Sequence, residues 1–406
     1  MKSEKFFHSS TAIITLFAAC FVVLISLGVR QTFGLFFIDF NESLNISNTA
    51  FGFAIGTQML MWGLTGPIFG AIADRFGGHV AIISSFLFYT LGVYFLYSGP
   101  NTGIFFQIHL GLLIGIGLGG TAISIPMSIV GKHFPLSNRT IAMSIVTAVG
   151  SFGYFISPIF TNYSLIEYGW NYTLFLFSLF LITGLIAAFF VRSPKENEIV
   201  ENRSDQSFKE ALGEAFKSKS YILLVSGFFV CGFHITLVGT HVPKYVIDRG
   251  LEDWTAAAIL SLIGLFNIFG SLLSGYLSTK ISKKILLSAI YLLRGFSIVF
   301  FIFTPPSVLS AFIFGASFGF LWLSTVPATS GIVAHLFGTK YLGLLYGIVF
   351  LSHQIGSFFG AYLGGLFHDL YGSYDYAWYL AILLSIFAAI IHLPIIEKPV
   401  ERLQKI

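Results

Sequence analysis

The chain has 406 residues, of which 55% are hydrophobic and 10% are charged, and its mean hydropathy is +0.84. Soluble domains carry about 25% charged residues, so an apolar excess of this size cannot be buried inside one soluble globule. The composition therefore predicts a polytopic membrane protein, with the lipid bilayer as a partner. A net charge of +4 is compatible with an acidic partner such as nucleic acid. The positions of the basic residues show whether this charge forms a binding surface.

Twelve apolar runs follow one another along the chain, each of about 20 residues or more, the length that a helix needs to cross the hydrocarbon core. The first run lacks a small-residue cleavage site, so it predicts a retained helix and not a removed signal peptide. The runs lie near residues 11–38, 48–72, 79–98, 102–132, 140–164, 170–192, 220–247, 255–278, 285–303, 307–337, 343–368 and 375–396. The predicted fold class is an all-α polytopic membrane protein with 12 transmembrane helices.

The lysines and arginines indicate the orientation of these helices. With the N-terminus inside, 18 of the 22 basic residues fall in interior segments. Lys244 and Arg249 remain outside, and Arg30 and Arg294 lie within helices. We therefore expect a multi-pass protein with both termini cytoplasmic. The positive charge is a topology signal, and no nucleic-acid partner is expected.

Similar segments recur at nearly constant offsets, which indicates an internal repeat. "GAIADR" (70–75) corresponds to "GYLSTK" (275–280), and "VGSFG" (149–153) to "IGSFFG" (355–360). The repeat predicts two pseudo-symmetric six-helix halves joined by a polar cytoplasmic linker. The expected domains are residues 1–192, 193–219 and 220–406.

"GAIADRFGGH" (70–79) resembles the signature G-x-x-x-D-R-x-G-R-[KR] of the major facilitator superfamily. Gly70, Asp74, Arg75 and Gly77 carry the resemblance, which covers essentially the whole chain. Within the superfamily, "GVRQTFGLFF" and "HQIGSFFGAYLGG" are similar to bacterial monocarboxylate and oxalate/formate porters. The resemblance implies a secondary transporter of the bacterial inner membrane that works by alternating access.

The same resemblance implies that the signature residues form a gating motif on the cytoplasmic side, the alternative being a solvated turn. We expect Gly70 to allow close helix approach and Asp74 to lie near a helix N-terminus. Gly356, Gly360 and Gly364 form a small-residue stripe at intervals of four, which predicts close helix packing.

Arg30 interrupts the first apolar run, and no Asp or Glu lies well inside any of the twelve runs. A charge inside the membrane is costly, and a guanidinium matches a carboxylate bidentately. An organic anion is therefore the predicted counter-ion, since helix one lines the central cavity in this superfamily. The alternative is that Arg30 snorkels outward or binds free backbone carbonyls. Arg294 is a weaker candidate for which a structural role is favoured.

Other polar groups inside the runs are candidates for binding substrate or a coupled proton. Histidine titrates near neutral pH, although a lone buried histidine is more often simply hydrogen-bonded. Two cysteines, Cys20 and Cys231, are predicted to be small apolar packing residues without a redox role. The remaining substrate-site candidates are Gln31, His234, His241, Asn267, His353 and Gln354, with His109 weaker.

The sequence lacks the motifs that other functional classes require. A primary pump would need a G-x-x-x-x-G-K-[ST] motif, and no metal cluster or nucleophile elbow indicates an enzyme. We expect no catalytic residue, metal or cofactor. The predicted function is secondary active transport of a small organic anion, monocarboxylate-like. The alternatives are an exporter of a larger amphipathic metabolite, siderophore or drug, and a non-transporting membrane sensor or scaffold.

Overall fold

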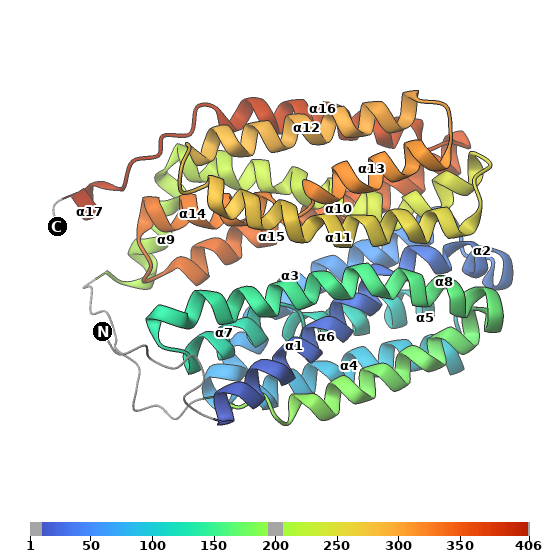
Figure 1. Ribbon diagram of the computed structural model, residues 1–406, viewed down its shortest axis with the longest axis horizontal. Coiled ribbons are helices and arrows are strands. Elements are labelled where there is room, and N and C mark those ends of the chain that lie inside the picture. The colour runs from blue at the N-terminus through green and yellow to red at the C-terminus, as the bar shows by residue number, and fades with distance from the viewer. Residues whose placement is uncertain (1–9, 194–205, 405–406) are drawn as a thin grey trace. The chain divides into compact units, whose positions relative to one another are not determined.

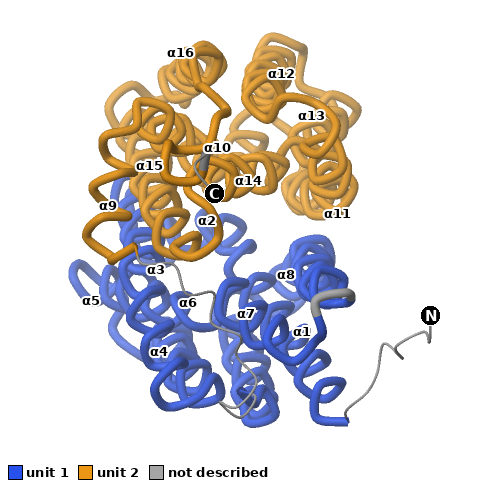
Figure 2. Tube along the Cα trace, turned by 90° about the vertical axis from the view of Figure 1, so that its left-hand side faces the viewer, with its two compact units in different colours: residues 1–198 blue, residues 199–406 orange. Residues whose placement is uncertain are grey.

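The computed structural model describes residues 10–193 and 206–404. Within these ranges all regular secondary structure is helical, as the sequence predicts. The chain divides into two compact units, residues 1–198 and 199–406 (Figure 2). Much of the predicted linker, residues 194–205, lies outside the described residues.

The N-terminal unit begins with an α-helix that is followed, after Gln31, by a 3-10 turn. α1 ends there, and a short 3-10 turn, η1, leads into α2. The Ser47 side chain caps α3, accepting a hydrogen bond from the Ala50 N–H at 3.1 Å. α8 contains two helices that meet at Gly169, whose φ is 78°. The elements are α1 (Ser10–Gln31), η1 (Phe33–Phe36), α2 (Phe37–Leu44), α3 (Asn48–Phe76), α4 (Gly78–Ser98), α5 (Ile104–Phe106), η2 (Gln107–Leu113), α6 (Ile114–Thr121), α7 (Ser124–His133) and α8 (Leu136–Ala188).

The C-terminal unit begins with a short amphipathic helix, α9, that starts in a capping box. The Glu210 N–H donates to the Ser207 hydroxyl at 3.3 Å, and the Ser207 N–H donates to the Glu210 carboxylate at 2.7 Å. The second bond lowers the pKa of Glu210. The elements are α9 (Phe208–Lys217), α10 (Lys219–Asp248), α11 (Asp253–Leu277), α12 (Lys283–Phe303), α13 (Val308–Phe320), α14 (Thr325–Phe337), α15 (Leu342–Tyr371), α16 (Asp375–His392) and α17 (Glu401–Gln404).

Ten stretches of the described residues are long and apolar enough to cross a membrane. One of them, residues 138–188, holds the two helices that meet at Gly169. α3 adds a further helix of 29 residues. The described residues therefore hold the twelve long helical segments that the sequence predicts.

The same helix pairings occur in both units (Figure 1). α1 packs on α8, α3 on α6 and α4 on the second helix within α8, while in the other unit α10 packs on α15, α11 on α13 and α12 on α16. The glycine stripe of α15 lies against α10: a Cβ at Gly356, Gly360 or Gly364 would overlap the Phe229 carbonyl, the Phe233 carbonyl or the His241 ring. The predicted close packing of this stripe is confirmed.

Candidate functional site

Arg30 lies in the last turn of α1, where the α-helix gives way to the 3-10 turn. Its side chain is 8% exposed. The break arises locally, because both the Thr32 N–H and the Thr32 hydroxyl donate to the Val29 carbonyl, at 3.3 and 2.9 Å. A helix C-terminus is a favourable place for a cation, since the dipole is negative there.

The guanidinium of Arg30 contacts only neutral groups among the described residues. Nη1 donates to Gln31 Oε1 at 3.3 Å, and Nη2 lies 3.1 Å from the sulfur of Met59. The phenol of Tyr154 also lies in hydrogen-bonding range, with Tyr89 nearby. A thioether is a weak acceptor, so this shell does not saturate the five donors of the guanidinium.

Neither structural alternative for Arg30 is observed. The side chain is buried and does not snorkel, and it donates to no backbone carbonyl of the described residues. The amide nitrogen of Gln31, which is 2% exposed, has no hydrogen-bond partner in the described part of the chain. Arg30 and Gln31 therefore form a pair of adjacent, incompletely satisfied hydrogen-bond donors.

Arg294 on α12 has the opposite environment. Its side chain is fully buried, and it donates from Nε and Nη2 to the Leu321 carbonyl, at 3.0 and 2.6 Å, and from Nη2 to the Trp322 carbonyl. These carbonyls lie where the chain breaks between α13 and α14. The Asn267 side chain holds the same break, accepting from the Leu323 N–H at 3.0 Å. Both residues hold backbone groups that the broken helix leaves without intrahelical partners.

The histidine candidates are also engaged with other helices. His234 Nε2 donates to the Ala381 carbonyl at 2.8 Å, and His241 Nε2 to the Ala361 carbonyl at 2.7 Å. In both rings Nδ1 is buried without a partner in the described residues. His109 Nδ1 donates to the Asn101 side chain at 3.2 Å, next to the turn that joins α4 to α5.

His353 and Gln354 form a second polar pair, on α15. His353 Nδ1 donates to Gln354 Oε1 at 3.0 Å, and its ring stacks on Phe350 with a centroid distance of 5.7 Å. Gln354 is fully buried, and its amide nitrogen has no partner among the described residues.

The gating-motif residues lie at the turn between α3 and α4. Asp74 pairs with Lys132 at the end of α7, with an Oδ1 to Nζ distance of 2.9 Å. The expected position of Asp74 near a helix N-terminus stays a prediction. Gly77, with φ 97° and ψ 151°, ends α3 in a conformation that suits glycine. A Cβ at Gly70 would meet nothing within 4 Å among the described residues, so the close helix approach expected there stays a prediction. Arg75 lies over the neighbouring Phe76 ring.

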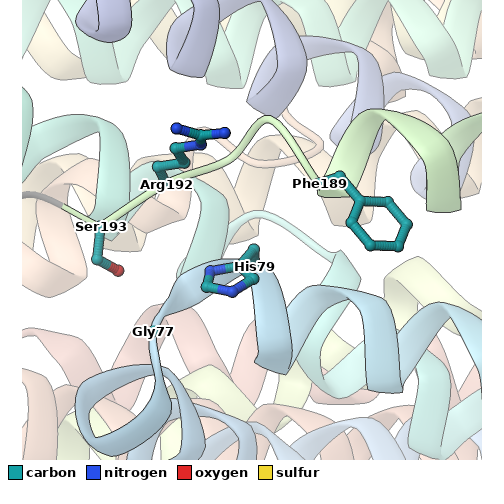
Figure 3. Close-up of a pocket in the computed structure, with 5 residues that line it drawn as sticks. All are labelled: Gly77, His79, Phe189, Arg192 and Ser193. Carbon is teal, nitrogen blue, oxygen red and sulfur yellow. The ribbon is translucent and has the colours of Figure 1, made fainter.

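A pocket of about 490 Å³ adjoins this turn, lined by Gly77, His79, Phe189, Arg192 and Ser193 (Figure 3). The Gly78 N–H donates to the Ser193 hydroxyl at 2.8 Å, which holds the end of the unit against the start of α4. The Thr15 hydroxyl donates to the Phe190 carbonyl, so the pocket lies beside the start of α1. Arg30 is 15 residues further along α1, about 22 Å at 1.5 Å per residue. The pocket is therefore separate from the Arg30 site.

The Major Facilitator Superfamily profile matches residues 19–328, more than half of the chain. The chain belongs to the Major Facilitator Superfamily. It is 23% identical over 401 residues to the uncharacterized MFS-type transporter YcxA of Bacillus subtilis (strain 168), covering 94% of this chain and 95% of YcxA. It is 24% identical over 369 residues to monocarboxylate transporter 13 of Rattus norvegicus, covering 87% and 82%.

The fold is also that of a solved superfamily structure. A bacterial homolog of the human lysosomal transporter Spinster, crystallised in an inward-facing and unoccupied conformation, superposes with a TM-score of 0.77 at 15% identity, covering 95% of this chain and 96% of that one. This superfamily member is therefore a multi-pass membrane transporter and not an enzyme.

Sequence reasoning missed several groups around the candidate residues of this superfamily member. Met59, Tyr89 and Tyr154 surround Arg30. A tyrosine inside an apolar span carries a hydroxyl that can be read in the sequence, whereas a methionine gives no such polar signal. Cys231, predicted to be apolar packing, instead accepts a hydrogen bond from Arg294. The prediction was wrong because it considered the composition of one helix alone.

Proposed function

We propose that this transporter carries a small organic anion of the monocarboxylate type and that Arg30 anchors its negative charge. The observation that carries the proposal is the environment of Arg30. A permanently charged side chain, 8% exposed, has no carboxylate partner among the described residues and retains unused donors. Burying an unpaired charge is costly, and a bound carboxylate would supply the missing counter-ion.

The neighbouring side chains suit the same ligand. A carboxylate has two oxygens, and a guanidinium binds both through parallel hydrogen bonds. Gln31 supplies a further N–H group that has no partner among the described residues. The similarity to a monocarboxylate transporter supports this substrate class. Coupling of anion transport to a proton is a further part of the proposal.

The proposal includes the orientation of the chain in the membrane and its division into two halves. Both termini lie in the cytoplasm, and the chain is arranged as the halves 1–192 and 220–406 around the linker 193–219. The excess of Lys and Arg in the segments assigned to the interior supports the orientation. The motif at Asp74 and Arg75 then acts on the cytoplasmic side as a gate.

The first test is thermal stabilisation of the purified protein by a panel of small carboxylates. We would measure melting at pH about 5.5 and about 7.5, on either side of the ordinary histidine pKa. A ligand at about 100 times its Kd contributes about 2.7 kcal/mol, which corresponds to a rise of about 5–10 °C for a unit of this size. A larger rise at the lower pH would indicate that a proton binds with the anion.

Arg30→Gln should lower the affinity for the stabilising acid by about 10-fold or more, because hydrogen bonds to charged groups contribute about 1.5–3 kcal/mol each. Arg139→Gln removes the same charge from an exposed position on α8 and should respond like the wild type. If no acid stabilises the protein, or if folded Arg30→Gln responds equally, the anion assignment fails. Screening larger amphipathic compounds then becomes the next experiment.

A further inference from the structure

Cys231 on α10 lies at the centre of a buried polar cluster in the C-terminal unit. Its side chain is fully buried. Nη1 of Arg294 donates to its sulfur at 3.3 Å, and the hydroxyl of Thr325 lies 3.2 Å from the same sulfur. Thr325 is the first residue of α14, so the sulfur faces the break that Arg294 holds together.

The other titratable groups around Cys231 are neutral or basic. Tyr291 on α12, Tyr346 on α15 and the His353 ring lie beside the sulfur. His234, on the same helix as Cys231, lies near Arg294. Within the described residues no Asp or Glu forms an ion pair with Arg294.

The N-terminal unit contains the corresponding junction, with Tyr89 in the place of Arg294 and with Arg30 beside that tyrosine. There Ser26 takes the place of the cysteine, 205 residues earlier, and its hydroxyl lies 2.7 Å from that of Thr121. Tyr89, 205 residues before Arg294, donates to the Ser26 carbonyl at 2.9 Å. A cysteine therefore replaces serine in the unit where an arginine replaces tyrosine.

This paired replacement has a physical reason. Backbone carbonyls satisfy the donors of Arg294 but do not neutralise its charge, and an unneutralised buried charge is costly. A thiol is the acid nearest to the guanidinium, and loss of its proton yields an anion that can accept from Arg294 and Thr325 together. A nearby cation favours the thiolate.

We propose that Cys231 and Arg294 form a buried thiolate–guanidinium ion pair, which makes Cys231 a proton-binding site of the C-terminal unit. When the site releases its proton, the S–H bond breaks, the sulfur keeps the electron pair and the proton passes to solvent. Rebinding restores the thiol, and no oxidation is involved. This inference goes beyond the proposed anion site and does not depend on it.

The two cysteines of the chain allow a matched test. Cys20 is buried in α1 and has no hydrogen-bond partner among the described residues, so it serves as the reference thiol. We would record the S–H stretching band by infrared spectroscopy on purified protein between pH about 5 and about 9, a range that includes the ordinary thiol pKa of about 8.5. Cys20→Ser reports Cys231 alone, and Cys231→Ser reports Cys20 alone.

We expect the Cys20→Ser protein to lack the S–H band at neutral pH and to gain it on acidification, while Cys231→Ser keeps its band throughout. Should Cys20→Ser not fold, the wild-type spectrum minus that of Cys231→Ser reports the same thiol. An S–H band from Cys231 at neutral pH, as strong as that from Cys20, overturns the proposal. Failure of carboxylate binding would leave this result unchanged, so the two proposals are tested separately.

Discussion

Replacing Gly360 with alanine tests the packing of α15 on α10. The added Cβ would lie 2.9 Å from the carbonyl carbon of Phe233 and 3.0 Å from its Cα, and closer still to its oxygen. These atoms belong to a helix backbone, so no side-chain rotation relieves the overlap and the two helices must separate. Overpacking of this kind costs about 1–3 kcal/mol.

The matched control is Gly347→Ala, on the same helix. A Cβ there meets nothing within 4 Å, and alanine in a compatible helical site stabilises by about 0.4–1 kcal/mol. We would compare both purified variants with the wild type by tryptophan fluorescence at one scan rate. Gly360→Ala should melt about 2–12 °C lower, while Gly347→Ala should melt at or above the wild-type temperature. Equal melting of the two variants would refute the close backbone contact.

Three further perturbations probe other parts of the fold. Arg294→Met leaves the carbonyls at the α13–α14 break unpaired and should destabilise by about 2–6 kcal/mol, measured by thermal melting. Gly77→Ala places a side chain in a backbone conformation that only glycine tolerates and should destabilise by about 1–3 kcal/mol in the same assay. The lowered pKa of Glu210 means that its capping bond is present above the ordinary carboxyl pKa and is lost as the pH falls through the folded value. Hydrogen exchange at the start of α9, corrected for intrinsic rates, should therefore accelerate below pH about 4, and Glu210→Ala, which lacks the accepting carboxylate, should show the same acceleration at neutral pH.

Some residues of the proposed gate and anion site could be recognised from the sequence, whereas their contacts could not. Gly77 was recognisable because a signature glycine ends a helix, and its positive φ explains the residue. Arg30 stood out because a charge in an apolar run is rare. The pairing of Asp74 with Lys132 was not foreseen, because these residues are 58 positions apart and only the packing of α3 and α7 brings them together.

Local patterns in the sequence were enough to determine the membrane class, the twelve helical segments and the small-residue stripe of α15. Hydrophobic length, capping residues and glycine spacing act within one or two turns of helix, so they can be read along the chain. Only the tertiary structure decided which polar groups meet. Arg294 and Arg30 look alike in sequence, yet one saturates the carbonyls of a broken helix 27 residues away and the other retains unused donors. That difference depends on helix rotation and on contacts between distant segments, which no local pattern encodes.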